Sequence, residues 1–165
     1  MNAATEFLIR AVLLGVGATL LIDLWAVLLR RLFAVPSLNW AMVGRWIGHF
    51  PRGQFVHDSI AKASPVSGEL ALGWLAHYAI GIGFAAVLLA LNGLAWGRAP
   101  TLLPALAVGI GTVIAPFFIL QPGMGLGIAA SKTPKPAVAR LRSLATHGLF
   151  GIGLYVTAQL LNAVW

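Results

Sequence analysis

The chain of 165 residues contains no cysteine and only four acidic residues. Without cysteine it forms no disulfide, no thiolate nucleophile and no thiolate metal site, so a secreted disulfide scaffold is excluded. Charged residues make up 9% of the chain and hydrophobic residues 59%, whereas about a quarter of the residues in a soluble domain are charged. So few charges cannot coat a soluble enzyme of this size, and so hydrophobic a chain is not disordered.

The hydrophobic residues are gathered into four long runs. A helix needs about 20 apolar residues to cross the hydrocarbon core of a bilayer. We therefore predict an all-α membrane protein, a single transmembrane domain over residues 1–165, with spans at about 7–32, 70–93, 101–121 and 141–163. We expect Pro116 to kink the third span, and Pro122 with Gly123 to end it. The first run is too long for a signal peptide and contains Asp23, so we keep it as a span.

The formal charge of +7 is concentrated between these runs, as membrane topology signals are, and we expect no nucleic-acid partner. The basic residues of the first and third loops are Arg30, Arg31, Arg45, Arg52 and Lys62, and Lys132, Lys135, Arg140 and Arg142. Only Arg10 and Arg98 lie on the opposite side. Because basic residues favour cytoplasmic loops, we expect both loops in the cytoplasm and both termini outside.

The first loop contains an amphipathic segment. Ser37 is a suitable helix N-cap, and a helix over about residues 37–50 would carry Arg45 and His49 on its polar face. Its apolar face would comprise Trp40, Val43, Trp46, Ile47 and Phe50. We predict an interfacial helix that lies on the inner leaflet. Residues 123–131 are expected to form a shorter re-entrant or interfacial piece.

The two halves of the chain resemble each other. A shift of 70 residues places His77 on His147, the glycines around Ile82 on those around Ile152, and Lys62 on Lys132. A shift of 94 places Gly15 and Gly17 on Gly109 and Gly111. We therefore predict two tandem hairpins related by a pseudo-two-fold axis along the membrane normal. The glycines assigned to close helix packing are Gly15, Gly17, Gly73, Gly81, Gly83, Gly109, Gly111, Gly151 and Gly153. Room for a ligand at the bundle centre is the alternative.

Three ionisable residues fall inside the predicted spans. Placing Asp23 at the bilayer centre costs roughly 3 kcal/mol on insertion scales, so its side chain should face the bundle interior and have a partner. At 1.5 Å per residue, Asp23, His77 and His147 all lie roughly 12–15 Å from the cytoplasmic interface. The chemistry that fits is a proton relay or proton-coupled substrate site, a metal ion, or haem b between the two histidines. A hydrogen bond that only fixes helix register is the structural alternative.

A second polar group lies in the first loop. Its members are His49, Arg52, His57, Asp58 and Glu69. Glu69 falls where the second span begins, and a carboxylate is electrostatically favoured at a helix N-terminus. We interpret Arg45, Arg52 and Lys62 as topology signals that contact lipid headgroups, with a cytoplasmic mouth for an anionic substrate or headgroup as the alternative.

The sequence resembles a family of small bacterial inner-membrane proteins that is described only as a domain of unknown function. The resemblance is carried by GVGATLLIDLWAVLLRRLF (15–33), SLNWAMVGRWIGHFPRG (37–53), HDSIAKASPVSGE followed by GWLAHY (57–78), and LRSLATHGLFGIGLY (141–155). It implies a polytopic protein of the bacterial inner membrane, with its outer termini in the periplasm. It implies no activity, cofactor or catalytic residue.

No hydrolase, P-loop or kinase motif occurs in the sequence, so an enzyme is not the favoured interpretation. We predict a small transporter-like or proton-relay membrane protein centred on Asp23, His77 and His147. The alternatives are a bis-histidine haem b electron carrier and a structural or accessory subunit. A chain this small lines a pathway more easily as a homo-oligomer, which we also expect.

Overall fold

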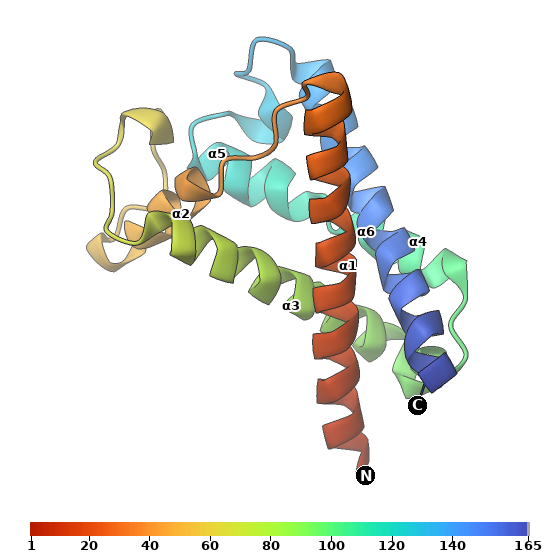
Figure 1. Cartoon of the computed structure of the whole chain (residues 1–165). Helices are drawn as coiled ribbons and strands as arrows, with labels where there is room; N and C mark the ends of the chain where they lie inside the picture. The colour runs from red at the N-terminus through yellow and green to blue at the C-terminus, as the bar shows by residue number, and fades with distance from the viewer. Residues whose placement is uncertain (165) are drawn as a thin grey trace. The chain divides into compact units, whose positions relative to one another are not determined.

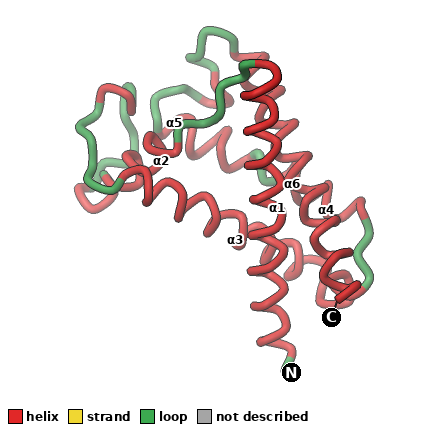
Figure 2. Tube along the Cα trace, in the orientation of Figure 1, coloured by secondary structure: helices red, strands yellow, loops and turns green. Residues whose placement is uncertain are grey.

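A computed structural model describes residues 1–164, and every regular element in this part of the chain is helical (Figures 1 and 2). The α-helices are α1 (Ala3–Phe33), α2 (Trp40–Gly48), α3 (Glu69–Arg98), α4 (Leu102–Gly111), α5 (Gln121–Gly123) and α6 (Pro136–Val164). Short 3₁₀ or π turns lie between them: η1 (Phe50–Arg52), η2 (Ile60–Lys62), η3 (Pro116–Leu120) and η4 (Ile128–Ala130).

The prediction of an all-helical chain with four long apolar helices is confirmed. The helical stretches Ala3–Phe33, Glu69–Arg98, Leu102–Gly123 and Pro136–Val164 are each long and apolar enough to cross a membrane. Several of these helices extend beyond the apolar runs because local capping continues them. The Asn2 side chain accepts a hydrogen bond from the Thr5 backbone N–H at 2.8 Å and so starts α1 before its apolar run. Likewise α6 begins at Pro136, where a missing N–H costs nothing.

The third apolar stretch leaves α-helical geometry earlier than the predicted kink at Pro116. Helix α4 ends at Gly111, and a π-helical segment follows over Pro116–Leu120. Pro116 has no N–H to donate to the carbonyl one turn before it, so the regular α-helical ladder cannot continue there. The N–H of Gln121 instead bonds the carbonyl of Pro116, which is the wider π spacing.

The described chain divides into two compact units, which are treated separately below. Unit 1 comprises residues 1–37, 78–112 and 145–164. Unit 2 comprises residues 38–77 and 113–144. Unit 1 therefore contains α1, α4, most of α3 and most of α6, whereas unit 2 contains the first turns of α3, α2, α5 and the long connections.

Unit 1 has a dry apolar core. The buried side chains that form it are Ala11, Leu14, Ala18, Ala85, Leu88, Leu89, Trp96, Ala105, Phe150, Leu154 and Ala158. They come from α1, α3, α4 and α6, so all four helices of the unit share one core. The N-terminal end of α1 and the C-terminal end of α6 lie at the same end of this unit (Figure 1).

Glycines allow the helices of unit 1 to approach closely. A Cβ added to Gly15 on α1 would overlap the backbone of Ile82 on α3, and a Cβ added to Gly109 on α4 would overlap Gly151 on α6. By contrast, a Cβ on Gly83 or Gly111 would meet no atom within 4 Å among the described residues. The G-x-G pairs therefore contain glycines of two kinds, and only some of them set a helix–helix distance.

Unit 2 is built around the packing of α2 on the start of α3. A Cβ on Gly44 would overlap the Glu69 carbonyl, and a Cβ on Gly73 would overlap the Trp40 carbonyl, so only small residues permit this contact. The prediction that Ser37 caps the loop helix is wrong. Asn39 caps it instead, because its side chain accepts from the Ala41 N–H at 3.1 Å.

Candidate functional site

Asp23 lies on the face of α1 that contacts α3 in unit 1. The hydroxyl of Tyr78 donates a hydrogen bond to Asp23 Oδ2 at 2.9 Å. Thr19, one turn before Asp23, faces Gly81, where a Cβ would overlap the Thr19 hydroxyl. The Thr19 side chain is 1% exposed, and its oxygen has no hydrogen-bond partner among residues 1–164. The α1–α3 contact thus combines a carboxylate, a phenol and a buried hydroxyl in otherwise apolar helices.

His147 is oriented by the end of α4. Thr112 Oγ1 lies 2.8 Å from His147 Nδ1, and the same hydroxyl donates to the Gly109 carbonyl at 2.6 Å. A threonine hydroxyl has one proton, and the carbonyl takes it, so His147 Nδ1 must be the donor to Thr112. The Nε2 atom then carries a lone pair, which a proton relay, a metal ion or a haem iron would each use.

His77 belongs to unit 2 and is packed among tryptophans. Its imidazole stacks on Trp40 with the ring centroids 3.8 Å apart, and Trp74 approaches it edge-on at 5.7 Å. The close approach of α2 to α3 places Trp40 on this ring. An indole face attracts a cation, so this environment favours the protonated imidazole more than an aliphatic one would.

The three predicted residues therefore lie in different units, Asp23 and His147 in unit 1 and His77 in unit 2. Their partners Tyr78, Thr112 and Trp40 were missed by sequence reasoning, because a phenol, a hydroxyl or an indole in an apolar run does not by itself indicate a polar site. Among residues 1–164, no three His, Asp or Glu side chains form a group that could hold a metal ion.

Within the loop group, the structure brings His49 and His57 together. His49 Nδ1 lies 2.7 Å from His57 Nε2, and the two side chains are buried. His57 Nδ1 lies 3.4 Å from the Gly123 carbonyl, and the His57 backbone N–H donates to the same oxygen at 2.9 Å. Because a carbonyl only accepts, His57 is protonated at Nδ1 and accepts the bond from His49. The pair thus joins the end of α2 to the turn at α5.

Arg45 does not contact headgroups as the sequence suggested, because it is buried and paired with Glu69. Its Nε and Nη2 atoms donate to the two Glu69 oxygens at 2.8 Å each, and Nη1 donates to the Ala63 carbonyl at 3.1 Å. The hydrogen bond to Glu69 raises the pKa of the Arg45 guanidinium above its ordinary value, against the opposing effect of burial. Glu69 also accepts from the Val66 N–H at 3.0 Å, so this ion pair closes the loop before α3.

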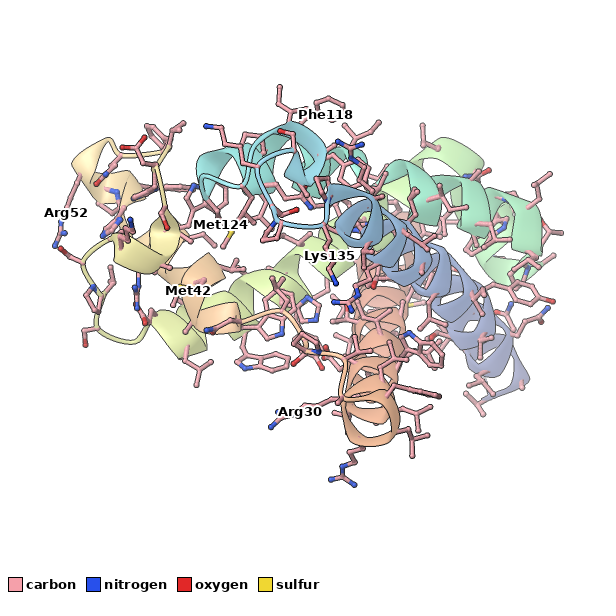
Figure 3. The ribbon with its side chains drawn as sticks, turned by 90° about the horizontal axis from the view of Figure 1, so that it is seen from above. Arg30, Met42, Arg52, Phe118, Met124 and Lys135 are labelled. Carbon is pink, nitrogen blue, oxygen red and sulfur yellow. The ribbon has the colours of Figure 1, made fainter. Side chains whose placement is uncertain are left out.

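Arg52 and Asp58 take no part in these contacts. Both side chains are exposed, and Arg52 points away from the rest of unit 2 (Figure 3). The five predicted loop residues therefore separate into a histidine pair, a carboxylate bound by Arg45, and two exposed charges.

Sequence reasoning missed a further polar cluster at the end of unit 1 where α1 begins. Glu6 pairs with Arg10 at 2.9 Å and with Arg98, and Arg10 also donates to the Gly97 carbonyl at 2.8 Å and to Asn162 at 3.0 Å. The four-residue spacing of Glu6 and Arg10 is the signal that could have identified it. Counting Arg10 only as a topology signal concealed this role.

A family model described as Protein of unknown function (DUF2938) matches residues 12–161. The chain belongs to this family. The resemblance to a family of unknown function is thereby confirmed. No curated protein and no solved structure matches the chain. The residues matched to DUF2938 include Asp23, His77 and His147, whereas Glu6 and Arg10 precede the match.

Proposed function

We propose that this member of the DUF2938 family is a multi-pass, transporter-like membrane protein that relays protons through Asp23, His77 and His147. The observation that carries the proposal is the hydrogen bond from Tyr78 to Asp23 at 2.9 Å, between two helices long and apolar enough to span a bilayer. An ionisable carboxylate is costly inside a bilayer, so its presence favours a role in ion or proton movement. The Tyr78 hydroxyl stabilises its charged form and fixes its direction.

The histidines supply the remaining groups of the relay. The tautomer of His147 that Thr112 imposes leaves Nε2 as a proton acceptor. The stacking of His77 on Trp40 favours a transient imidazolium. Imidazole is suited to both roles because its ordinary pKa lies close to physiological pH.

The membrane arrangement that accompanies this proposal has both long loops in the cytoplasm and both termini in the periplasm of a bacterial inner membrane. Helix α2 then lies at the inner interface. Two tandem hairpins form the spans, a repeat supported by one equivalence of contacts. Gly15 meets α3 at Gly81 and Ile82, and its counterpart Gly109 meets α6 at Gly151, the counterpart of Gly81. A homo-oligomer would line the pathway.

The proposal is tested with the full chain in proteoliposomes. A potassium diffusion potential drives protons inward, and an enclosed pH-sensitive dye reports the flux. We expect flux above that of protein-free liposomes, and Asp23→Asn should abolish it. Tyr78→Phe should slow it about tenfold, as expected for loss of one hydrogen bond to a charged group.

Tyr155→Phe is the matched control. The Tyr155 hydroxyl accepts from its own helix neighbour Gln159 at 3.0 Å and has no part in the proposed relay. Its removal should leave the flux unchanged. Flux that is indistinguishable from that of empty liposomes, or that persists in Asp23→Asn, would contradict the relay. A variant that loses thermal stability without loss of flux would indicate a purely structural role for Asp23.

A further inference from the structure

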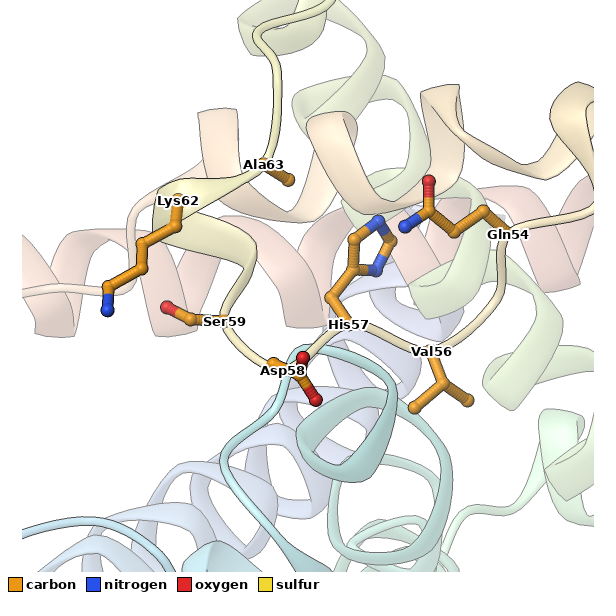
Figure 4. Close-up of a pocket in the computed structure, with 7 residues that line it drawn as sticks. All are labelled: Gln54, Val56, His57, Asp58, Ser59, Lys62 and Ala63. Atoms are coloured by element: carbon orange, nitrogen blue, oxygen red, sulfur yellow. The ribbon is translucent and has the colours of Figure 1, made fainter.

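The loop between α2 and α3 forms a pocket of about 380 Å³ in unit 2 (Figure 4). The residues that matter for its chemistry are Gln54, His57, Asp58, Ser59 and Lys62. The close-up shows the Lys62 ammonium and the Ser59 hydroxyl pointing to the same side, with Asp58 next along the chain. One pocket therefore presents an ammonium, a hydroxyl and a carboxylate together.

The two charges in this pocket have no partner in the protein. Glu6, Glu69 and Asp23 are bound by arginines or by Tyr78, whereas Asp58 makes no side-chain hydrogen bond or ion pair with residues 1–164. Within the same described part of the chain, Lys62 has none either, although it lies in the same pocket. Opposite charges that share a pocket without neutralising each other are available to the opposite charges of one ligand.

The wall behind these charges is rigid. His57 lines the pocket, is 6% exposed, and is fixed by His49 and by the Gly123 carbonyl. Arg45 binds the carbonyl of Ala63, which also lines the pocket. The backbone that bears Asp58 and Lys62 is thus fixed by buried contacts, while their side chains remain free. A preorganised wall lowers the entropy cost of binding.

Exposed apolar side chains adjoin the pocket. Phe55 is 55% exposed and Val56 is 69% exposed, and Val56 contributes to the pocket lining. In a loop that connects two apolar, membrane-length helices, such side chains are suited to contact with acyl chains. A ligand with a zwitterionic head and an apolar tail satisfies both the charges and this lip.

We propose that this pocket binds the phosphoethanolamine headgroup of a membrane phospholipid. The primary ammonium of the headgroup donates to Asp58, and its phosphate accepts from Lys62 and from the Ser59 hydroxyl. Phosphatidylcholine carries the same charges but has no N–H to donate. Phosphatidylglycerol has no cation, so it would leave Asp58 facing an anion. The site rests on the chain being embedded in a membrane and is independent of the proton relay.

The test is native mass spectrometry of the full chain in detergent with equal amounts of dioleoyl phosphatidylethanolamine, phosphatidylcholine and phosphatidylglycerol. We expect the ethanolamine lipid to be retained about fivefold more than the choline lipid, which corresponds to one charge-assisted hydrogen bond at a partly exposed site. Asp58→Asn should bring this ratio close to one. Lys62→Gln should lower the retention of all three lipids.

Lys132→Gln is the matched control, because Lys132 is the counterpart of Lys62 in the 70-residue repeat and is also exposed. It should leave all three retentions unchanged. Asp58 and Lys62 are exposed and unpaired, so their variants should keep the wild-type melting temperature, which is measured in parallel. An ethanolamine preference that survives Asp58→Asn, or equal retention of the lipids by the wild type, would overturn the proposal. Full displacement by equimolar free phosphoethanolamine would indicate a soluble ligand instead of a lipid. Because no transport is measured, the lipid site can fail while the relay holds, and the reverse.

Discussion

The two units satisfy their buried polar groups in different ways. In unit 1, long helices use almost every backbone N–H and carbonyl internally, so Asp23 is bound by another side chain, Tyr78, and Thr112 and Arg10 reach carbonyls only near helix ends. In unit 2, the loops leave carbonyls free, and Arg45 and His57 bind those of Ala63 and Gly123. Polar side chains therefore consolidate the loops of unit 2, whereas packing glycines consolidate unit 1.

The largest effect should come from breaking the ion pair of unit 2. Arg45→Gln leaves the Glu69 carboxylate without its two-point partner and releases the Ala63 carbonyl, so the loop before α3 loses its anchor. We expect a marked drop in the melting temperature in detergent and rapid protease cleavage within residues 50–68. Arg52→Gln, at an exposed arginine of the same loop, should change neither. Equal behaviour of the two variants would show that Arg45 does not consolidate unit 2.

The next effect separates the two kinds of glycine in unit 1. Gly109→Ala places a methyl group on the backbone of Gly151, and overpacking of this kind typically costs about 1–3 kcal/mol. Gly111→Ala, two residues later, meets no described atom within 4 Å and should be neutral or slightly stabilising, because alanine favours helix. Unfolding in a denaturing detergent measures both. If the two substitutions proved equally costly, α4 would not approach α6 through Gly109.

The helices could be predicted because hydropathy is a local property. Four apolar runs predicted four long helices, and Asp23 stood out as an acidic residue inside one of them. The break in the third run was misplaced because the π segment depends on how Gln121 satisfies the Pro116 carbonyl, which a proline alone does not reveal.

The polar partners could not be predicted because they depend on packing between distant segments. Arg45 looked like a headgroup contact until α2 was seen to pack on α3 through Gly44 and Gly73, which brings it to Glu69. The same holds for His49 and His57, whose pairing requires the loop to turn back against Gly123. Sequence reasoning named most members of this group but not the contacts that divide it.

The smallest effect concerns a single hydrogen bond in unit 1. Thr112→Val removes the oxygen that accepts from His147 Nδ1, and a loss of about 1 kcal/mol is expected for one hydrogen bond. The more sensitive readout is the tautomer. Nitrogen-15 NMR of the histidines should find His147 protonated at Nδ1 in the wild type and a mixture of tautomers in the variant. Thr146→Val, beside His147 and without a side-chain hydrogen bond to the described residues, should leave the spectrum unchanged. A wild-type His147 protonated only at Nε2 would reverse the direction of the Thr112 bond, and the proton acceptor in the relay would then be Nδ1.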